Sequence, residues 1–251
     1  MFGQNVTRGH DDAQRKDALD VVAIFPTIQG EGPLAGTPAV FVRLAHCNLK
    51  CWFCDTQFEE GAETLTHDEV LLRMSDAAGA NVRLVVITGG EPFRQPLREF
   101  TRRLVAAGFL VQFETAGSLQ PHPVDGEHWW LDRGISNGYM FVVISPKTPT
   151  LAPTFRAMAE CNEYGDRVAL KYIIHAGSIG PSGLPMASTQ KQGPGRPPWS
   201  SYNINRSRIF LQPMDEHDEE RTRANVQATI DACRAHGYRL SLQLHKIVGL
   251  P

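Results

Sequence analysis

The sequence has no apolar run long enough for a membrane-spanning helix, and it has no excess of positive charge. Its 25 Lys and Arg residues are outnumbered by 27 Asp and Glu residues, which gives a formal net charge of -2. A broad basic surface of the kind that binds nucleic acid is therefore not expected. These absences predict a soluble globular protein with no membrane or nucleic-acid partner, and they favour a small-molecule partner.

The sequence also lacks a recognisable secretory signal. Residues 1–20 are polar and contain no apolar h-region, so we expect a polar N-terminal extension and a cytoplasmic location. In the reducing cytosol, cysteines serve metals or chemistry more often than disulfides. Residues 21–251 are enough for one sizeable core, and barrel-type α/β folds of this length commonly form a single domain.

Short runs of β-branched and other apolar residues alternate with amphipathic segments along the chain. The runs predict strands at 39–45, 83–88, 110–115, 140–145, 168–175, 208–213 and 238–244. The amphipathic segments predict helices at about 67–78, 96–107, 153–163 and 217–236. This alternation favours an α/β fold with a mostly parallel sheet, curled into an incomplete (β/α) barrel of the TIM type with about six core strands.

Two segments interrupt the alternation. Residues 176–207 are rich in Gly, Pro and Ser and are too long for an ordinary connection, so we expect a flexible insertion or lid. Residues 118–138 show no convincing helical pattern, and packing is the favoured role of the pair Trp129 and Trp130.

Three of the five cysteines, Cys47, Cys51 and Cys54, are spaced as CxxxCxxC. A structural zinc site normally has four protein ligands, and His46 is a poor fourth because its side chain should point away from the neighbouring Cys47. A ferredoxin-type four-iron cluster takes four thiolates, and no fourth cysteine lies nearby. Three thiolates would leave one iron open.

The pattern CxxxCxΦC, formed by Cys47, Cys51, Phe53 and Cys54, resembles the signature of the radical S-adenosylmethionine superfamily. The resemblance implies a 4Fe-4S cluster on the three cysteines and a modified barrel of the radical S-adenosylmethionine type. It also implies that S-adenosylmethionine chelates the open iron and is cleaved to a 5'-deoxyadenosyl radical, so the cofactors carry the chemistry. In this family the residue at Phe53 packs against the adenine.

A second resemblance to this superfamily lies in "TGGEP", which directly follows a predicted strand. It implies that Gly89, Gly90 and Glu91 hold the methionine amine. By the same resemblance, further contacts to S-adenosylmethionine come from residues beside the cysteines and at two later strand ends. They are Asp55, Ser145, Pro146, Lys147, Gln212, Pro213, Met214 and Asp215.

Residues 25–56 resemble the start of the 7-carboxy-7-deazaguanine synthase family, in which a Q-G-E-G turn precedes the cysteines. The similarity continues through "VVITGGEP", "ISPK", "LQPMDE" and "LSLQLHKIVGLP". It implies a magnesium-dependent carbon-nitrogen lyase of queuosine and 7-deazapurine biosynthesis. The reaction is the ring contraction of 6-carboxy-5,6,7,8-tetrahydropterin to 7-carboxy-7-deazaguanine, with loss of ammonia.

The same resemblance assigns residues to the substrate and to magnesium. Arg43 can pair with the substrate carboxylate in bidentate geometry, and Thr56 matches the magnesium ligand. The remaining substrate contacts are Ile28, Gln29, Gly30, Glu31, Thr88, His245 and the carboxylate of Pro251. The family also suggests a homodimer and an electron donor such as a flavodoxin.

Two other functions remain open on sequence grounds. A glycyl-radical-activating enzyme shares the CxxxCxxC loop but acts on a protein, and it would need neither the Q-G-E-G turn nor the terminal Pro251. A non-catalytic metal-binding module is the alternative from a different class, and colourless protein containing zinc would favour it.

Overall fold

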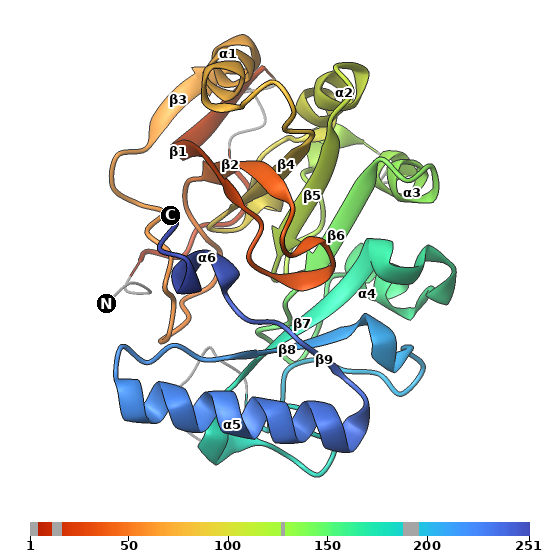
Figure 1. Ribbon diagram of the computed structural model, residues 1–251. Helices are drawn as coiled ribbons and strands as arrows, with labels where there is room; N and C mark the ends of the chain where they lie inside the picture. The colour runs from red at the N-terminus through yellow and green to blue at the C-terminus, as the bar shows by residue number, and fades with distance from the viewer. Residues whose placement is uncertain (1–4, 12–16, 127–128, 188–195) are drawn as a thin grey trace.

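The computed structural model describes residues 5–11, 17–126, 129–187 and 196–251. Its main feature is a nine-stranded sheet with the strand order β3-β1-β2-β4-β5-β6-β7-β8-β9. β2 and β4 to β9 are parallel, whereas β1 pairs antiparallel with both β2 and β3. The sheet curls but its described edges, β3 and β9, do not pair with each other (Figure 1). The predicted incomplete barrel is confirmed.

The strands are β1 (Ala18–Ile28), β2 (Pro38–Leu44), β3 (Glu63–Thr66), β4 (Leu84–Gly89), β5 (Leu110–Thr115), β6 (Met140–Ile144), β7 (Val168–Ile174), β8 (Ile209–Pro213) and β9 (Arg239–Leu240). The helices are α1 (His67–Ala77), α2 (Arg98–Ala106), α3 (Trp129–Ser136), α4 (Pro153–Glu160), α5 (Glu219–His236) and α6 (Leu244–Ile247). Short 3₁₀ helices lie between them, at η1 (Gly32–Leu34), η2 (Pro92–Arg94), η3 (Pro123–Asp125), η4 (Asn162–Arg167), η5 (Ala176–Ser178) and η6 (Arg206–Arg208).

Several sequence predictions need correction. The strand predicted at 238–244 is only the two-residue β9, and the chain then turns into α6. The segment 118–138, in which no helix was expected, contains α3, and Trp130 of this helix is buried. β1 and β3 were not predicted. β1 begins at Ala18, within the predicted N-terminal extension, and Leu19 belongs to the core.

The segment 176–207 was predicted to be a flexible insertion, and its centre, residues 188–195, lies outside the described residues. On either side of that centre the chain is anchored to the domain. Before it, the Tyr238 hydroxyl donates to the carbonyl of Ser182 at 2.9 Å. The backbone N–H of Trp199 donates to the carbonyl of Thr148 at 2.8 Å, and Ile204 is buried in the core. The role of the segment stays a prediction.

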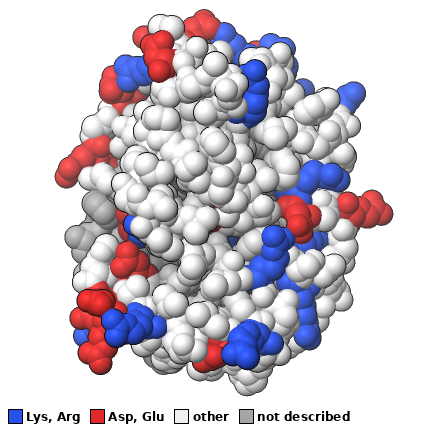
Figure 2. All heavy atoms as spheres, in the orientation of Figure 1, with Lys and Arg blue, Asp and Glu red and all other residues white. Residues whose placement is uncertain are grey.

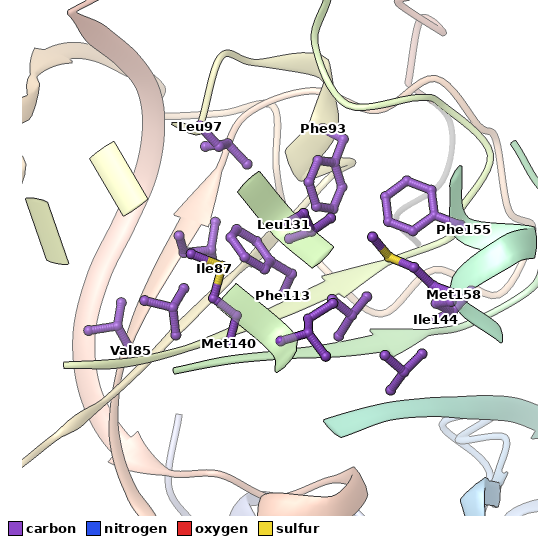
Figure 3. Packing of buried hydrophobic residues seen from close by; sticks show 14 of the residues in the cluster. Val85, Ile87, Phe93, Leu97, Phe113, Leu131, Met140, Ile144, Phe155 and Met158 are labelled. Atoms are coloured by element: carbon purple, nitrogen blue, oxygen red, sulfur yellow. The ribbon is translucent and has the colours of Figure 1, made fainter. Parts of the chain in front are cut away.

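The main core lies between the outer face of the sheet and the helices that cover it. Figure 3 shows Val85, Ile87 and Phe113 from the strands facing Leu131 and Met158 from the helices. Side chains alternate along each strand, so every second residue of the sheet faces inward instead. These helices therefore fix the strands whose inner faces form the site.

The inner face of the sheet changes character along the strands. Near the beginnings of β2 and β4, Ala39, Leu84 and Val86 form a small apolar cluster. Toward the carboxyl ends the inward side chains include the charged residues Arg43, Glu114 and Lys171, which lie beside apolar Val143 and Ile173. On the molecular surface shown in Figure 2, charged side chains of both signs lie mainly around the rim. The carboxyl ends of the strands are therefore the chemically active end of the barrel.

The last eleven residues cross the open side of the barrel, from β9 toward β1 (Figure 1). The backbone N–H of Leu244 donates to the carbonyl of Gly30 at 3.2 Å, and Thr27 Oγ1 donates to the carbonyl of Pro251 at 3.0 Å. The hydroxyl of Ser241 accepts from the N–H of Gly32 at 3.0 Å. This segment therefore supplies a wall that the strands leave open.

Candidate active site

A pocket of about 400 Å³ lies at the carboxyl ends of the parallel strands. Most residues predicted from the sequence line it: Gln29, Glu31, Arg43, Cys47, Cys51, Phe53, Cys54, Asp55, Thr56, Thr88, Gly89, Gly90, Ser145, Lys147, Gln212, Pro213, Met214, Asp215, His245 and Pro251. Four others, Ile28, Gly30, Glu91 and Pro146, are not among the lining residues. One cavity thus brings together residues from both ends of the chain.

The loop after β2 carries the three thiols, and Gly90 holds this loop against β4. A Cβ atom on Gly90 would lie 1.7 Å from the carbonyl oxygen of His46, and one on Gly89 would lie 2.2 Å from that of Leu44. The N–H of Glu91 also donates to the His46 carbonyl at 3.0 Å. The two glycines are therefore required for close backbone packing beneath the thiols, in addition to their position in the pocket.

Glu91 lies behind this loop with its carboxylate fully buried. Thr115 Oγ1 donates to it at 2.7 Å, and the backbone N–H groups of Ala116 and Phe93 donate at 2.9 and 3.2 Å. Burial raises the pKa of Glu91 to about 7, although these donors oppose the shift. These hydrogen bonds tie the end of β4 to the end of β5, and the assignment of Glu91 to the methionine amine stays a prediction.

The three thiols form no disulfide within the described residues, and they are partly buried in the pocket lining. Burial raises the pKa of Cys54 to about 11 and that of Cys47 still higher, so both favour the protonated form without a bound cation. Within the described part of the chain, no group of three His, Cys, Asp or Glu side chains is placed to hold a single metal ion. A set of three thiols on one loop, with no fourth cysteine beside them, fits an iron-sulfur cluster with one open iron.

Arg43 projects into the pocket from the inner face of β2, as the alternation with buried Val42 and Leu44 predicts. Its guanidinium lies 5.1 Å from the centroid of the Phe25 ring, and its buried Nε has no hydrogen-bond partner. A buried donor without an acceptor is costly. Arg43 is therefore suited to a ligand that brings an anionic acceptor.

Glu114 on β5 is a pocket residue that the sequence reasoning missed. Its carboxylate accepts from Gln29 Nε2 at 3.0 Å, from Thr88 Oγ1 at 3.1 Å and from Gln112 Nε2 at 3.2 Å. These bonds join β5 to β4 and to the turn after β1. They fix the orientation of Gln29 and Thr88, two side chains predicted to contact the substrate.

Lys171 on β7 was also missed, and it forms a buried ion pair with Glu31. Burial disfavours both charges, but each partner outweighs this effect, so the pKa of Lys171 is raised and that of Glu31 is lowered. Gln243 Nε2 donates to Glu31 Oε1 at 2.9 Å. Both residues are therefore charged at neutral pH. The signal in the sequence was a single lysine inside the apolar run "VALKYII".

Lys246 joins three parts of the pocket wall. Its Nζ donates to Asp55 Oδ2 at 3.0 Å and to Asp215 Oδ2 at 2.9 Å. These bonds connect α6 to the loop of the thiols and to the loop after β8. Next to it, the ring of His245 packs so closely on Gly30 that a Cβ atom there would lie 2.1 Å from His245 Nδ1. Gly30 therefore acts by making room for His245.

The side of the pocket assigned to S-adenosylmethionine contains an aromatic ring and a buried polar atom that lacks a hydrogen-bond partner among the described residues. Gln212 Oε1 is buried without a hydrogen-bond partner. The Phe53 ring lies 5.5 Å from Lys147 Nζ, which also donates to Ser145 Oγ at 2.6 Å. An aromatic face, an ammonium and a free amide oxygen suit a ligand with an adenine, a carboxylate and an amine.

Thr56 and Asp55 offer oxygens at the pocket lining. Thr56 Oγ1 donates to Asp55 Oδ1 at 3.3 Å, whereas Asp55 Oδ2 is occupied by Lys246 and Gln243. Two adjacent oxygens fit a magnesium ion, which usually keeps several waters and borrows further ligands from its substrate.

Comparison with known proteins agrees with this geometry. The family model for the radical SAM superfamily matches residues 42–129. A 7-carboxy-7-deazaguanine synthase of Rhodospirillum rubrum is 38% identical, with 99% of each chain covered. The chain belongs to the 7-carboxy-7-deazaguanine synthase family. The synthase of Rickettsia prowazekii is 33% identical and covers 100% of this chain.

The fold also resembles that of a solved structure. The crystal structure of QueE from Escherichia coli superposes with a TM-score of 0.57 at 21% identity and covers 90% of this chain and 94% of its own. Membership in this synthase family implies a 4Fe-4S cluster, S-adenosylmethionine and magnesium as cofactors. Among the helices in the described residues, none has the length and apolar character needed to cross a membrane.

Proposed function

We propose that the protein is a 7-carboxy-7-deazaguanine synthase, which contracts the ring of 6-carboxy-5,6,7,8-tetrahydropterin with loss of ammonia. One observation carries the proposal: a single pocket is lined by the three thiols, by Arg43, whose buried Nε has no acceptor among the described residues, and by Pro251. The full-length similarity to synthases supports it over a glycyl-radical-activating enzyme and over a non-catalytic metal-binding module.

Cys47, Cys51 and Cys54 would hold the 4Fe-4S cluster. Phe53, Lys147, Ser145 and the segment from Gln212 to Asp215 would bind S-adenosylmethionine beside it, with Gln212 Oε1 accepting from its amine. When bound, these groups supply the electron and the radical that removes the hydrogen at C6 of the pterin. The protein holds the reactants and excludes water; no side chain is assigned as acid or base.

Arg43 would bind the substrate carboxylate, because its guanidinium is fixed over Phe25 and lacks an acceptor. Gln29, Glu31 and Thr88 would contact the pterin edge, and Glu114 and Lys171 would hold these three in orientation through the bonds described above. His245 and the Pro251 carboxylate would close the substrate side of the pocket.

Thr56 would bind magnesium, with Asp55 assisting through Oδ1. This assignment is tested by Thr56→Val, which removes the hydroxyl oxygen, and by Thr56→Ser, which keeps it. We expect Thr56→Val to lose the rate increase that magnesium gives and Thr56→Ser to retain it. Equal stimulation of both variants would overturn the assignment.

A homodimer, a flavodoxin-like electron donor and a location in the cytoplasm are also part of the proposal, and the first two follow from the family resemblance alone. Sedimentation of the purified protein tests the first. Replacement of dithionite by a reduced flavodoxin in the assay tests the second.

The activity itself is tested on the reconstituted protein under anaerobic conditions, with dithionite, magnesium, S-adenosylmethionine and carboxytetrahydropterin. Mass spectrometry should detect 7-carboxy-7-deazaguanine. Absence of this product, from protein whose iron and sulfide contents match a four-iron cluster, would overturn the proposal.

A further inference from the structure

Residues 5–11, here called the N-terminal strap, lie across the back of the loop that carries the thiols. The N–H of Arg8 donates to the carbonyl of Cys47 at 2.9 Å, and Asn5 Nδ2 donates to the carbonyl of Leu49 at 3.0 Å. At its other end the N–H of Asp11 donates to the carbonyl of Arg94 at 3.0 Å. The strap therefore binds both the thiol loop and η2.

The strap buries the guanidinium of Arg94, whose residue is only 3% exposed. Arg94 Nε donates to the carbonyls of Arg8 and Gly9, and its Nη1 approaches the carbonyl of Ala45 at 3.5 Å. Arg8 thus bonds Cys47 through its N–H and Arg94 through its carbonyl. The backbone of Arg8 therefore connects the Arg94 guanidinium to the loop that carries Cys47.

Arg94 is a cation with negative or ionisable neighbours. Burial lowers its pKa and the Arg8 cation adds to this shift, while Asp11, the Cys47 thiol and Asp20 oppose it, so these four groups lie within electrostatic reach of the guanidinium. The Asp11 carboxylate also lies 3.1 Å from His122 Nε2. An arginine stays protonated even when buried. Its hydrogen bonds to Arg8, Gly9 and Ala45 all go to neutral carbonyls, which do not neutralise its positive charge, so its electric field reaches the neighbouring thiol loop.

We propose that Arg94, fixed by the N-terminal strap, is a positioning residue that raises the reduction potential of the cluster bound at Cys47, Cys51 and Cys54. A fixed positive charge stabilises the form of the cluster that has gained one electron. The electron comes from a low-potential one-electron donor, for which dithionite serves in the test. Asp11 partly offsets the charge. The inference rests on the cluster of the proposed function, but not on the identity of its substrate.

The test is a redox titration of the reconstituted full-length protein, followed by electron paramagnetic resonance of the reduced cluster. Arg94→Met removes the charge, and at a fixed potential we expect about a tenfold lower ratio of reduced to oxidised cluster, equal to ~59 mV for one electron. Arg94→Lys should remain closer to the wild type. Asp11→Asn should shift the ratio in the opposite direction, toward the reduced form.

Shifts of the reduction potential in opposite directions for Arg94→Met and Asp11→Asn indicate an electrostatic role. A purely structural effect, such as loosened packing, would not depend on whether a positive or a negative charge had been removed. Unchanged potentials, or shifts of one sign in Arg94→Met and Asp11→Asn, would overturn the inference. If Arg94→Met does not fold, Arg94→Gln removes the same charge with a polar side chain and takes its place in the comparison with Asp11→Asn. If the wild-type protein holds the cluster but makes no 7-carboxy-7-deazaguanine, the proposed function is refuted. The measured reduction potentials then still decide the role of Arg94.

The strap itself is tested by a matched pair at Arg8. Arg8→Pro removes the N–H that bonds Cys47, whereas Arg8→Ala removes the exposed side chain and keeps that N–H. Both variants remove the Arg8 cation, which lies within electrostatic reach of Arg94, so the difference between them reports the N–H alone. We expect the potential of Arg8→Pro to be lower than that of Arg8→Ala and shifted toward that of Arg94→Met. The same potential in both variants would show that the strap does not hold Arg94 in place.

Discussion

Lys171 of β7 and Glu31, which follows β1, form an ion pair within the pocket, and each side chain is only 10% exposed. The two elements lie on opposite sides of the open barrel, so the pair joins the antiparallel strand at one edge to the parallel strands near the other. Replacement of one partner of a buried ion pair lowers the stability of the protein more than replacement of both, because it leaves one buried charge without its partner.

Lys171→Met leaves Glu31 as a buried charge without its partner. We expect the free energy of unfolding of the apoprotein to fall by about 3–5 kcal/mol, measured by urea denaturation. The double variant Glu31→Gln, Lys171→Met should recover part of this loss. Arg102→Met serves as the control, because its pair with Glu99 is exposed and should contribute little to the free energy of unfolding. Equal losses in the buried and exposed variants would contradict the prediction.

Arg43→Met should weaken binding of the substrate carboxylate. A hydrogen bond to a charged group contributes roughly 1.5–3 kcal/mol, so we expect KM for carboxytetrahydropterin to rise by about 10- to 100-fold. Arg43→Lys keeps the charge but not the bidentate geometry, so its KM should lie between those of the wild type and Arg43→Met. Iron content should match the wild type in both variants. A KM that does not change in Arg43→Met would remove Arg43 from the substrate site.

Glu91 should make the stability of the apoprotein depend on pH. Its folded pKa, about 7, lies above the ordinary value of 4.5, so the folded state holds this proton more tightly than the unfolded state. Its contribution to stability is therefore full below about pH 4.5 and is lost as the pH rises to about 7, a change of about 3 kcal/mol. Thermal unfolding of wild type and Glu91→Gln between pH 4 and 8 measures the difference.

A matched variant tests the cause of that dependence. Thr115 Oγ1 donates to the Glu91 carboxylate, so Thr115→Val should raise the pKa of Glu91 and move the loss of stability to higher pH. If wild type and Glu91→Gln keep a constant difference in stability across this range, Glu91 does not titrate there.

Each of Cys47→Ala, Cys51→Ala and Cys54→Ala should abolish the brown colour and the iron content of reconstituted protein, because the loop offers only three thiols. Cys161→Ala and Cys233→Ala are the controls, since neither lines the pocket, and both should retain iron and sulfide. Retention of iron by any loop variant, measured by iron and sulfide analysis, would be inconsistent with the assigned cluster ligands.

Gly90→Ala should displace the thiol loop, because a Cβ atom would lie 1.7 Å from the His46 carbonyl. We expect overpacking to cost about 1–3 kcal/mol in stability and cluster retention to fall. Gly79→Ala is the control, since a Cβ atom there would contact nothing within 4 Å. Thermal unfolding and iron analysis of the two variants provide the comparison, and similar behaviour of both would disprove the packing role.

The parallel strands were predictable because strands covered on both faces are nearly continuous apolar runs. β1 escaped prediction because Pro26 interrupts its pattern, and proline is rarely found inside a sheet. The proline is tolerated because β3 pairs only with Ala18–Val21, so at Pro26 β1 has a pairing partner, β2, on one side only. α3 was missed because it has eight residues and includes Gly134, which packs against Met140.

The site was predictable where chemistry concentrates in one short motif, as in the thiol loop and "TGGEP". Lys171, Glu114, Gln243 and Lys246 were missed because each is a single polar residue whose partners lie far along the chain. A charged residue at an inward position of a parallel strand is the signal that could have identified Lys171 and Glu114, because such a position has no route to solvent except through the pocket.

The final segment across the open side also sets an order for folding. Thr27 and Pro251, which are bonded, are 224 residues apart, and contacts of this separation form late because a long loop must close first. A chain still emerging from the ribosome already contains the thiol loop but lacks the segment from Ser241 to Pro251. The pocket is therefore completed only after the segment from Ser241 to Pro251 has left the ribosome, and until then the thiol loop is open on the side where α6 will lie.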